Sequence, residues 1–152
     1  GGSLYELGSY PLLPIVKLLG TDYQTLDFYT RMKDGVDMYT KGVLKYDKAV
    51  SSFKVGLGVK TEGNLVISGT KGYAYVPAPG WKTDYFEIRY ENPKENKRYF
   101  YQLDGEGIRY ELVDFLRSIE RGKSLPNINF STTKAISTIM EDFFFKKKYM
   151  SI

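Results

Sequence analysis

Apolar and polar residues alternate with a period of two through most of the chain between Tyr23 and Leu103. One clear stretch runs from Leu26 to Met32, and a second runs from Ala49 to Lys60. Such alternation is typical of antiparallel strands that place one face on a core and leave the other more polar. Sequences rich in turn-forming residues separate the alternating stretches. We therefore predict strands, joined as a meander, at residues 23–32, 36–46, 49–60, 64–68, 72–77, 84–91 and 97–103.

Helical spacing of apolar residues flanks this region on both sides. We predict a first helix from Ser9–Tyr10 to Gly20, with proline tolerated in its first turn. A second helix ends at Arg121-Gly122, and a third is capped by Ser131. The predicted apolar stripes are Leu12, Leu13, Ile15, Val16 and Leu19, then Ile108, Leu112, Phe115, Leu116 and Ile119, and finally Ile136, Ile139, Met140, Phe143 and Phe144.

This order of elements predicts an α+β fold. We expect an open, mainly antiparallel sheet of about six to seven strands, with the N-terminal helix and the two C-terminal helices packed on one face. The other face carries Tyr29, Tyr39 and Lys41, and Tyr73, Tyr75, Tyr99 and Tyr101 are candidates to join them. Tyrosine is enriched where a surface meets a partner. We therefore expect a homo-oligomer formed through the open sheet face, the alternative being tyrosines scattered singly on a solvated sheet.

The composition excludes several classes of function. The 152 residues include no cysteine and no histidine, which excludes disulfides, thiolate chemistry, the usual zinc ligands and the usual general base. No apolar run reaches the roughly 18 residues of a transmembrane helix. The net charge of +4 comes from basic residues interleaved with acidic ones. We interpret the one dense run, Lys146-Lys147-Lys148, as the last turn of the third helix. We expect a single cytoplasmic domain over residues 1–152, with no metal, membrane or nucleic-acid partner.

Two glycine-containing segments resemble nucleotide-binding motifs only in part. Gly56-Leu57-Gly58 lacks the third glycine of a dinucleotide fingerprint and falls inside a predicted strand. Gly69-Thr70-Lys71-Gly72 lacks the spacing and the Lys-Ser/Thr pair of a phosphate loop. We interpret both as turns or strand glycines, and we expect this chain to bind no dinucleotide by itself.

The first ten residues, from Gly1 to Tyr10, combine glycines, an acid and a phenol just before a helix. Glu6 and Tyr10 are four residues apart, so a helix-like turn projects both from the same side. A tyrosine hydroxyl can donate or accept a proton in catalysis. The alternative is a glycine-rich start to a helix with one exposed Glu and one half-buried Tyr.

This opening, followed by Pro11-Leu12 and Leu18-Leu19-Gly20, resembles the start of the C-terminal domain of the Gfo/Idh/MocA family, the glucose–fructose oxidoreductases and inositol dehydrogenases. The resemblance extends over nearly the whole chain. The segment 67–73 looks like the family's Gly-Thr-Glu-Gly hairpin, residues 107–111 are similar to its penultimate helix, and residues 148–151 are similar to its closing Tyr-x-Ser.

The resemblance implies an NAD(P)-dependent oxidoreductase of sugars or polyols. It implies an N-terminal Rossmann domain that holds NAD or NADP and is absent from this chain, which starts without Met inside a glycine motif. It also implies that the present domain closes the substrate site and dimerises through its sheet. By this resemblance Tyr10 is the catalytic proton donor or acceptor, and Glu6, in place of the commoner Asp, contacts the substrate. The family's catalytic Lys belongs to the missing domain.

Four further residues are candidate substrate ligands. Arg109 and Tyr110 belong to the segment that is similar to the family's penultimate helix. Trp81 and Lys82 follow Pro77-Ala78-Pro79-Gly80, which is either pocket lining or a rigid surface turn. Two alternatives to the oxidoreductase remain: a non-catalytic assembly or ligand-binding module of the same fold, and a nucleic-acid binder that uses tyrosines and lysines on the sheet, which the low charge density disfavours.

Overall fold

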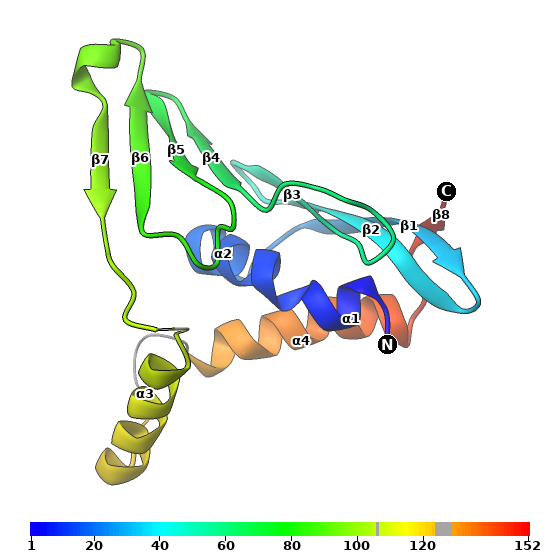
Figure 1. Ribbon diagram of the computed structural model, residues 1–152. Coiled ribbons are helices and arrows are strands. Elements are labelled where there is room, and N and C mark those ends of the chain that lie inside the picture. The colour runs from blue at the N-terminus through cyan, green and yellow to red at the C-terminus, as the bar shows by residue number, and fades with distance from the viewer. Residues whose placement is uncertain (106, 124–128) are drawn as a thin grey trace. The chain divides into compact units, whose positions relative to one another are not determined.

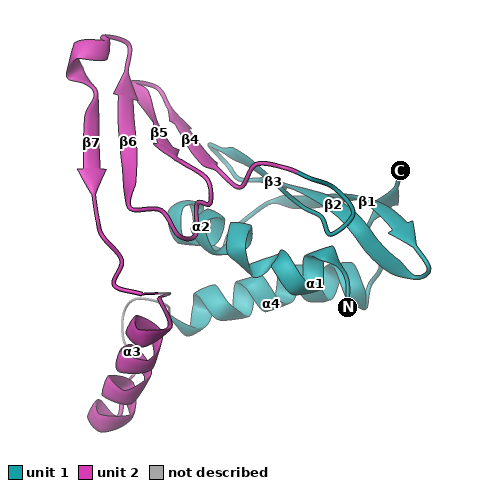
Figure 2. Cartoon of the chain, viewed as in Figure 1, with its two compact units in different colours: residues 1–60, 126–152 teal, residues 61–125 magenta. Residues whose placement is uncertain are grey.

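The computed structural model describes residues 1–105, 107–123 and 129–152, and its contacts divide the chain into two compact units. Unit 1 comprises residues 1–60 and 126–152, and unit 2 comprises residues 61–125 (Figure 2). The predicted α+β class, with mainly antiparallel strands, is confirmed. Among the described residues the strands form two four-stranded sheets, one in each unit.

Unit 1 is a sheet with helices on one face (Figure 1). Its elements are α1 (Ser3–Leu7), α2 (Ser9–Leu19), β1 (Thr25–Lys33), β2 (Val36–Lys45), β3 (Val50–Val55), α4 (Phe130–Phe144) and β8 (Met150–Ser151). The strand order is β3-β2-β1-β8. β1, β2 and β3 pair antiparallel, whereas the two-residue β8 runs parallel to β1. β8 was not predicted, because two residues are too few to show an alternating pattern.

The core of unit 1 lies between this sheet and its helices. Phe28 of β1 meets Phe143 of α4 edge to face, with ring centroids 5.2 Å apart, and Phe53 of β3 at 6.4 Å. In the predicted stripe of α4, Ile139 and Phe143 are buried, and Ile136, Met140 and Phe144 pack against the core. The buried apolar residues are Leu4, Leu12, Ile15, Val16, Phe28, Leu44, Tyr46, Phe53, Val55, Ile139 and Phe143.

The hairpin between β1 and β2 forms as its sequence predicts. Asp34 and Gly35 both have positive φ, 52° and 77°, which is the conformation of the two-residue turn that Asp-Gly favours. A β-bulge follows, because Arg31 pairs with Tyr39 whereas Met32 pairs with Asp37. Met38 is therefore the extra residue. The bulge shifts the alternation of β2 by one residue and brings Asp37 onto the buried face that Thr40 occupies.

Two predicted boundaries in unit 1, the end of β3 and the cap of α4, are wrong. β3 ends at Val55, so Leu57 and Val59 are exposed instead of lying in a strand. The pairing of β3 with β2 stops at Thr40 because the bulge disrupts the ladder beyond it. The cap of α4 is Asn129, whose side chain accepts from the Thr132 N–H at 2.9 Å, instead of Ser131.

The lysine run follows α4 instead of forming its last turn. α4 ends at Phe144, and Lys147 adopts a positive φ of 49°, which a continuing helix does not allow. Lys146 reaches back to Asp142, with Nζ 2.6 Å from Oδ1, and Lys148 lies 3.6 Å from Oδ2 of the same carboxylate. Lys146 and Lys148 therefore form ion pairs with Asp142 near the end of the helix.

Unit 2 is an antiparallel meander followed by a helix (Figure 1). Its elements are β4 (Leu65–Gly69), β5 (Gly72–Val76), β6 (Tyr85–Tyr90), a 3-10 turn (Pro93–Glu95), β7 (Lys97–Phe100) and α3 (Ile108–Arg121). The strands lie in sequence order, as the meander predicts. The stripe predicted to be buried on α3 is largely exposed: Ile108, Leu112, Phe115, Leu116 and Ile119 keep 55–62% of their surface. The periodicity predicted the helix correctly, but no described residue covers this stripe.

Candidate functional site

Glu6 and Tyr10 lie along one helical path at the start of unit 1. Gly8, between α1 and α2, has helical dihedral angles, φ −63° and ψ −32°. Its N–H donates to the Leu4 carbonyl at 2.8 Å, and its carbonyl accepts from the Leu12 N–H at 3.2 Å. On such a path a separation of four residues places both side chains on the same side. Both are exposed, Tyr10 by 53%, so a carboxylate and a phenol share one surface.

The same helical path was expected to begin only at Ser9–Tyr10. The structure adds α1 before it, with a break at Gly8. Pro11 accounts for the break, because it has no N–H to donate to the Leu7 carbonyl. The first ten residues alone contain three glycines and no helical apolar repeat, so their periodicity could not predict α1.

A buried polar cluster holds the beginning of α1 against β2. Asp37 is 1% exposed, and its Oδ2 accepts hydrogen bonds from the Leu4 N–H and the Thr40 hydroxyl, both at 2.8 Å. The Ser3 hydroxyl donates to the Asp37 carbonyl at 2.7 Å and accepts from the Leu57 N–H at 3.0 Å. These contacts fix the backbone from which Glu6 and Tyr10 project.

Sequence reasoning did not single out Asp37. By simple alternation Asp37 falls on the same side as the exposed Lys41, and only the bulge at Met38 turns it inward. The glycine at position 2 is the sequence feature connected with this contact. In the structure its φ is 145° and Asp37 lies beside it, and both exclude a side chain at this position. A Cβ on Gly2 would lie 2.0 Å from Asp37 Oδ1.

Trp81 and Lys82 lie in the loop between β5 and β6 in unit 2. The loop is tied down locally: the Gly80 N–H donates to the Gly63 carbonyl at 2.7 Å, and the Lys82 N–H donates to the Pro79 carbonyl at 2.9 Å. Trp81 is 62% exposed. These hydrogen bonds hold the loop and its exposed indole in place. The arrangement agrees with both alternatives, a rigid surface turn and the lining of a pocket.

Arg109 and Tyr110 occupy the first turn of α3, also in unit 2. The Arg109 guanidinium forms an ion pair with Asp104, and the Tyr110 hydroxyl accepts from the Asp104 N–H at 2.9 Å. Both side chains thus brace the loop that leads into α3. This local bracing is a structural role that the resemblance did not imply.

The structure brings the six predicted site residues together only in part. Glu6 and Tyr10 share a helical surface in unit 1, Arg109 and Tyr110 share Asp104 in unit 2, and Trp81 and Lys82 share a loop in unit 2. The role of these residues in binding or converting a substrate stays a prediction.

One face of the unit 2 sheet carries a compact charged and aromatic group. Glu87 accepts from Arg89 Nε at 2.6 Å and from Arg98 Nε at 2.9 Å. The Arg89 guanidinium lies 4.6 Å from the ring centroid of Tyr75, and that of Arg98 lies 4.8 Å from Tyr85. Hydrogen bonds from the two guanidinium groups hold the pKa of Glu87 below its ordinary value.

The predicted tyrosines divide between the two faces of this sheet. Tyr73 and Tyr75 lie on the Glu87 side, as their pairing with Arg89 and Glu87 requires. Tyr99, another candidate for the tyrosine face, pairs with Phe86 and stacks on it at 5.0 Å. Glu87 and Arg98 are the next pair in register, so Phe86 and Tyr99 lie on the other face.

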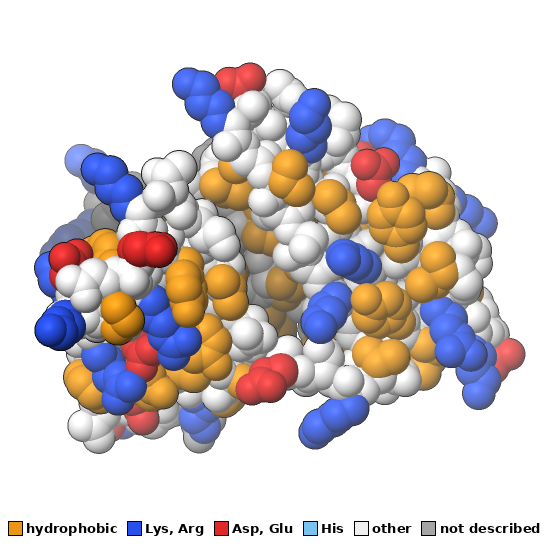
Figure 3. Space-filling model, turned by 90° about the horizontal axis from the view of Figure 1, so that it is seen from above, with side chains coloured by type: hydrophobic (Ala, Val, Ile, Leu, Met, Phe, Trp, Pro, Cys, Tyr) orange, Lys and Arg blue, Asp and Glu red, His pale blue; other side chains and the backbone are white. Residues whose placement is uncertain are grey.

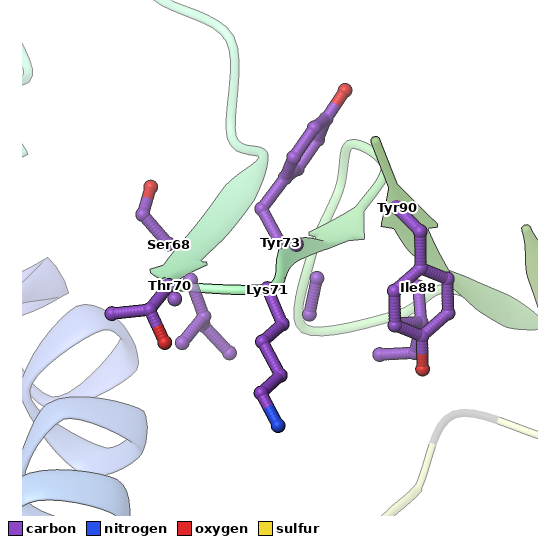
Figure 4. Close-up of a pocket in the computed structure, with 10 residues that line it drawn as sticks. Ser68, Thr70, Lys71, Tyr73, Ile88 and Tyr90 are labelled. Atoms are coloured by element: carbon purple, nitrogen blue, oxygen red, sulfur yellow. The ribbon is translucent and has the colours of Figure 1, made fainter. Parts of the chain in front are cut away.

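A shallow hollow of about 360 Å³ lies at the β4–β5 hairpin. Figure 4 shows Ser68 and Tyr73 pointing to one side of the hairpin, and Lys71, Ile88 and Tyr90 pointing to the other. Gly69 pairs with Gly72 across the turn, so this glycine pair belongs to a hairpin and not to a strand-to-helix phosphate loop. None of the six predicted site residues lines the hollow.

Charge is dispersed over the face of the molecule that Figure 3 draws. Seen from above, lysine and arginine side chains are interspersed with hydrophobic ones and do not form a stripe (Figure 3). Within the described ranges, no three acidic, histidine or cysteine side chains come together as a metal site, and no helix is long and apolar enough to cross a membrane.

Comparison with known proteins relates this chain to oxidoreductases. No family model matches it. It is 28% identical, over 93% of its length and 46% of the relative, to trans-1,2-dihydrobenzene-1,2-diol dehydrogenase of Oryctolagus cuniculus. The protein of the same name in Sus scrofa is 26% identical, with 93% of this chain and 45% of the relative covered. The chain therefore spans about half the length of the curated relatives that it matches.

Solved structures share the fold. All of this chain and 47% of the other superpose on KijD10, a 3-ketoreductase from Actinomadura kijaniata in complex with NADP and TDP-benzene, with a TM-score of 0.78 and 13% identity. A second structure of KijD10, in complex with NADP, gives a TM-score of 0.74 at 12% identity, with all of this chain and 49% of the other covered. The relatives of this chain are thus oxidoreductases, and its structural neighbours include an oxidoreductase with NADP bound.

Proposed function

We propose that this chain is the substrate-binding and oligomerisation domain of an NAD(P)-dependent oxidoreductase of the Gfo/Idh/MocA type. The observation that carries the proposal is the 28% identity to a dihydrodiol dehydrogenase over 93% of the chain. The fold shared with an NADP-bound 3-ketoreductase supports it. The exposed pair Glu6 and Tyr10 supplies the chemistry that such a domain needs.

The substrate is proposed to be a sugar or a polyol. The curated relatives are named for a ring-borne vicinal diol, and KijD10 is described in complex with a thymidine diphosphate compound. A vicinal diol has a hydroxyl group next to the reacting carbon, as sugars and polyols do. The paired acceptor and donor groups of Glu6 and Tyr10 suit two neighbouring oxygens.

In the proposed reaction the side chains of this domain hold the substrate and move one proton. On reduction the Tyr10 hydroxyl donates its proton to the carbonyl oxygen and becomes a phenolate, and on oxidation the phenolate of Tyr10 accepts the proton of the carbinol hydroxyl. The Glu6 carboxylate accepts a hydrogen bond from the adjacent hydroxyl and orients the ring. The nicotinamide supplies the hydride chemistry.

The two glycine-containing segments of this chain do not have the geometry of a strand-to-helix dinucleotide loop. Gly56 and Gly58 follow a strand without leading into a helix, and Gly69 and Gly72 belong to a hairpin. Holding the pyrophosphate requires a glycine-rich turn at a helix N-terminus. We therefore assign NAD or NADP to an N-terminal Rossmann domain of the full-length protein.

The test is turnover by the full-length protein. Trans-1,2-dihydrobenzene-1,2-diol, inositol and aldoses are offered with NAD or NADP, and nicotinamide reduction is followed by its absorbance. We expect oxidation of at least one of these diols or polyols. Dinucleotide binding without turnover of any of them would favour the alternative, a ligand-binding module of the same fold. Absence of dinucleotide binding to the full-length protein would overturn the proposal.

A further inference from the structure

We propose that Asp37 is a positioning residue, which sets the placement of Glu6 and Tyr10 through the first turn of α1; this inference rests on the proposed function. Asp37 lies on β2, 27 to 31 residues away in sequence, and its hydrogen bonds go to Leu4, Ser3 and Thr40 instead of to either side chain. Its influence runs through the backbone.

The first step is the capping of α1. The N-cap residue Gly2 offers no side chain to the first turn, so the helix has no local acceptor there. Asp37 Oδ2 supplies one from β2, at 2.8 Å from the Leu4 N–H. A hydrogen bond to a carboxylate inside a protein is stronger than one between neutral groups. A helix of five residues is too short to hold its own geometry, so this contact has a large effect.

The second step is how completely Asp37 is enclosed. It is 1% exposed, and Thr40, Thr30 and Ser3 around it are fully buried. Thr40 donates to Oδ2 at 2.8 Å, and the hydroxyl of Thr30 lies 2.8 Å from that of Thr40. Gly2 lies so close to Oδ1 that no other residue fits. The Asp37 carboxylate is therefore held in one position, and its hydrogen bond to Leu4 sets the position of α1.

Helical hydrogen bonds connect the Asp37–Leu4 contact to Glu6 and Tyr10. The Gly2 carbonyl accepts from the Glu6 N–H at 3.0 Å, and the Leu4 carbonyl accepts from the Gly8 N–H at 2.8 Å. Leu4 is thus one turn before Gly8, which is two residues before Tyr10. A shift of about 1 Å in a reacting group can lower the rate about 100-fold. Loss of the Asp37–Leu4 contact is therefore expected to reduce the chemical step.

Packing alone does not explain the bulge at Met38. Without it, alternation would place the apolar Met38 in the core and leave Asp37 at the surface. An apolar residue there would cost less to bury, since a buried carboxylate must be satisfied by hydrogen bonds. The chain instead deforms a central strand to bring a carboxylate to the start of α1. Bulges that re-aim a side chain are concentrated next to active sites.

The experiment compares Asp37→Ala and Asp37→Asn in the full-length protein, with Tyr46→Phe as the matched control. Tyr46→Phe also removes one hydrogen bond of unit 1, the partly buried bond from the Tyr46 hydroxyl to the Gly20 carbonyl at 3.1 Å, but at the far end of α2. We expect Asp37→Ala to lower kcat by about 10-fold to 100-fold with little change in KM. Asn keeps an oxygen for the Leu4 N–H and should restore part of kcat. Tyr46→Phe should leave kcat within about two-fold.

Amide hydrogen exchange provides a readout that does not depend on activity. In the 152-residue chain, Asp37→Ala should speed the exchange of the Leu4 to Gly8 amides by about 10-fold relative to the rest of unit 1. Faster exchange with unchanged kcat would make Asp37 a structural residue only. Unchanged exchange would overturn the proposal even if the full-length protein has no turnover, so the two proposals fail separately. If Asp37→Ala does not fold, Asp37→Asn and Ser3→Ala give the same two readouts.

Discussion

The indole of Trp81 lies against the α-carbon of Gly63, so closely that a Cβ built on Gly63 would come 2.8 Å from Cζ3 and 3.1 Å from Cη2. The Gly80 N–H and the Gly63 carbonyl join the same two segments at 2.7 Å. A glycine before β4 therefore sets the position of the one tryptophan in the chain. Trp81 is a predicted substrate ligand of the proposed enzyme, so we expect its position to affect binding.

Gly63→Ala is expected to displace the Trp81 side chain, because the added methyl group and the ring cannot occupy the same space. Since the chain has a single tryptophan, its fluorescence reports this site alone. We expect a shifted emission maximum and altered quenching by acrylamide. Asn64→Ala, a change at the neighbouring exposed residue, is the control and should leave the spectrum unchanged. In the full-length protein Gly63→Ala should raise KM more than it lowers kcat. Identical spectra would refute the described contact.

Tyr10→Phe should lower kcat of the full-length protein by about 100-fold to 10,000-fold, because it removes a proton-transfer group and keeps the ring. KM should change much less. Tyr5→Phe is the matched control: Tyr5 is also exposed and also on the opening helical path, but its ring packs against Phe144 at 5.9 Å. Steady-state kinetics of both variants make the comparison. Equal turnover by Tyr10→Phe and the parent would reduce Tyr10 to a surface residue.

Much of the fold could be predicted from the sequence because its signals are local. The turn at Asp34-Gly35 and the helix end at Gly122 depend on residues whose dihedral preferences fix the backbone. All seven predicted strands are present, and most of their ends lie within one or two residues of the predicted bounds. β3 and β7 are the exceptions: β3 ends at Val55 because its pairing stops at the bulge in its neighbour, and β7 ends at Phe100, three residues before the predicted bound.

The candidate site was less predictable because its parts depend on tertiary contacts. Glu6 and Tyr10 could be proposed from their spacing, but the acceptor that holds their helix comes from Asp37, across a bulge that no periodicity reveals. The roles of Arg109 and Tyr110 at Asp104 depend in the same way on a contact outside their helix. The exposed apolar stripe of α3 shows a further limit of sequence reasoning. The spacing of apolar residues predicts a helix, but it does not predict which residues cover that helix.

Stability should fall in acid through two carboxylates. Hydrogen bonds from Lys146 lower the pKa of Asp142, and those from Arg89 and Arg98 lower the pKa of Glu87. A group whose pKa is lower in the folded state stabilises the fold above its unfolded pKa, about 4 for Asp and Glu, and this contribution disappears as the pH falls through the folded value. The free energy of unfolding, measured with denaturant between pH 7 and pH 2, should therefore decrease below about pH 4.

Asp142→Asn and Glu87→Gln identify the source of this decrease. Each variant should be less stable than the parent at pH 7 and should differ less from it at pH 2, because the parent's carboxylates take up protons as the pH falls. Asp22→Asn is the control, because Asp22 is exposed and contacts only the neighbouring Thr21 hydroxyl in the described hydrogen bonds. A constant difference between variant and parent over the whole range would contradict the assignment.

The outer face of the unit 1 sheet is expected to hold two copies of the chain together. Tyr29 of β1 pairs with Lys41 of β2, Lys41 pairs with Lys54 of β3, and Met150 of β8 pairs with Tyr29 on the other side. The helices cover the opposite face (Figure 1). The simplest closed assembly of identical chains is a two-fold pair with the same face on each side. A stable interface of this kind buries roughly 1,200–2,000 Å² in total.

Replacing Tyr29 and Tyr39 by Lys should split this pair. Each chain then adds two cations beside Lys41 and Arg31, and the two-fold axis sets four new positive charges against each other without a change in the core. The control is Tyr101→Lys with Gln102→Lys, which adds the same charge at exposed positions beyond β7. Sedimentation at tens of micromolar should find a dimer for the parent and the control, and a monomer for the double variant. A monomeric parent would mean that the unit 1 sheet face does not associate. A dimer that survives both tyrosine changes would move the interface to another surface, of which the Glu87 face of unit 2 is the next to test, because it pairs its charges internally and presents aromatic rings.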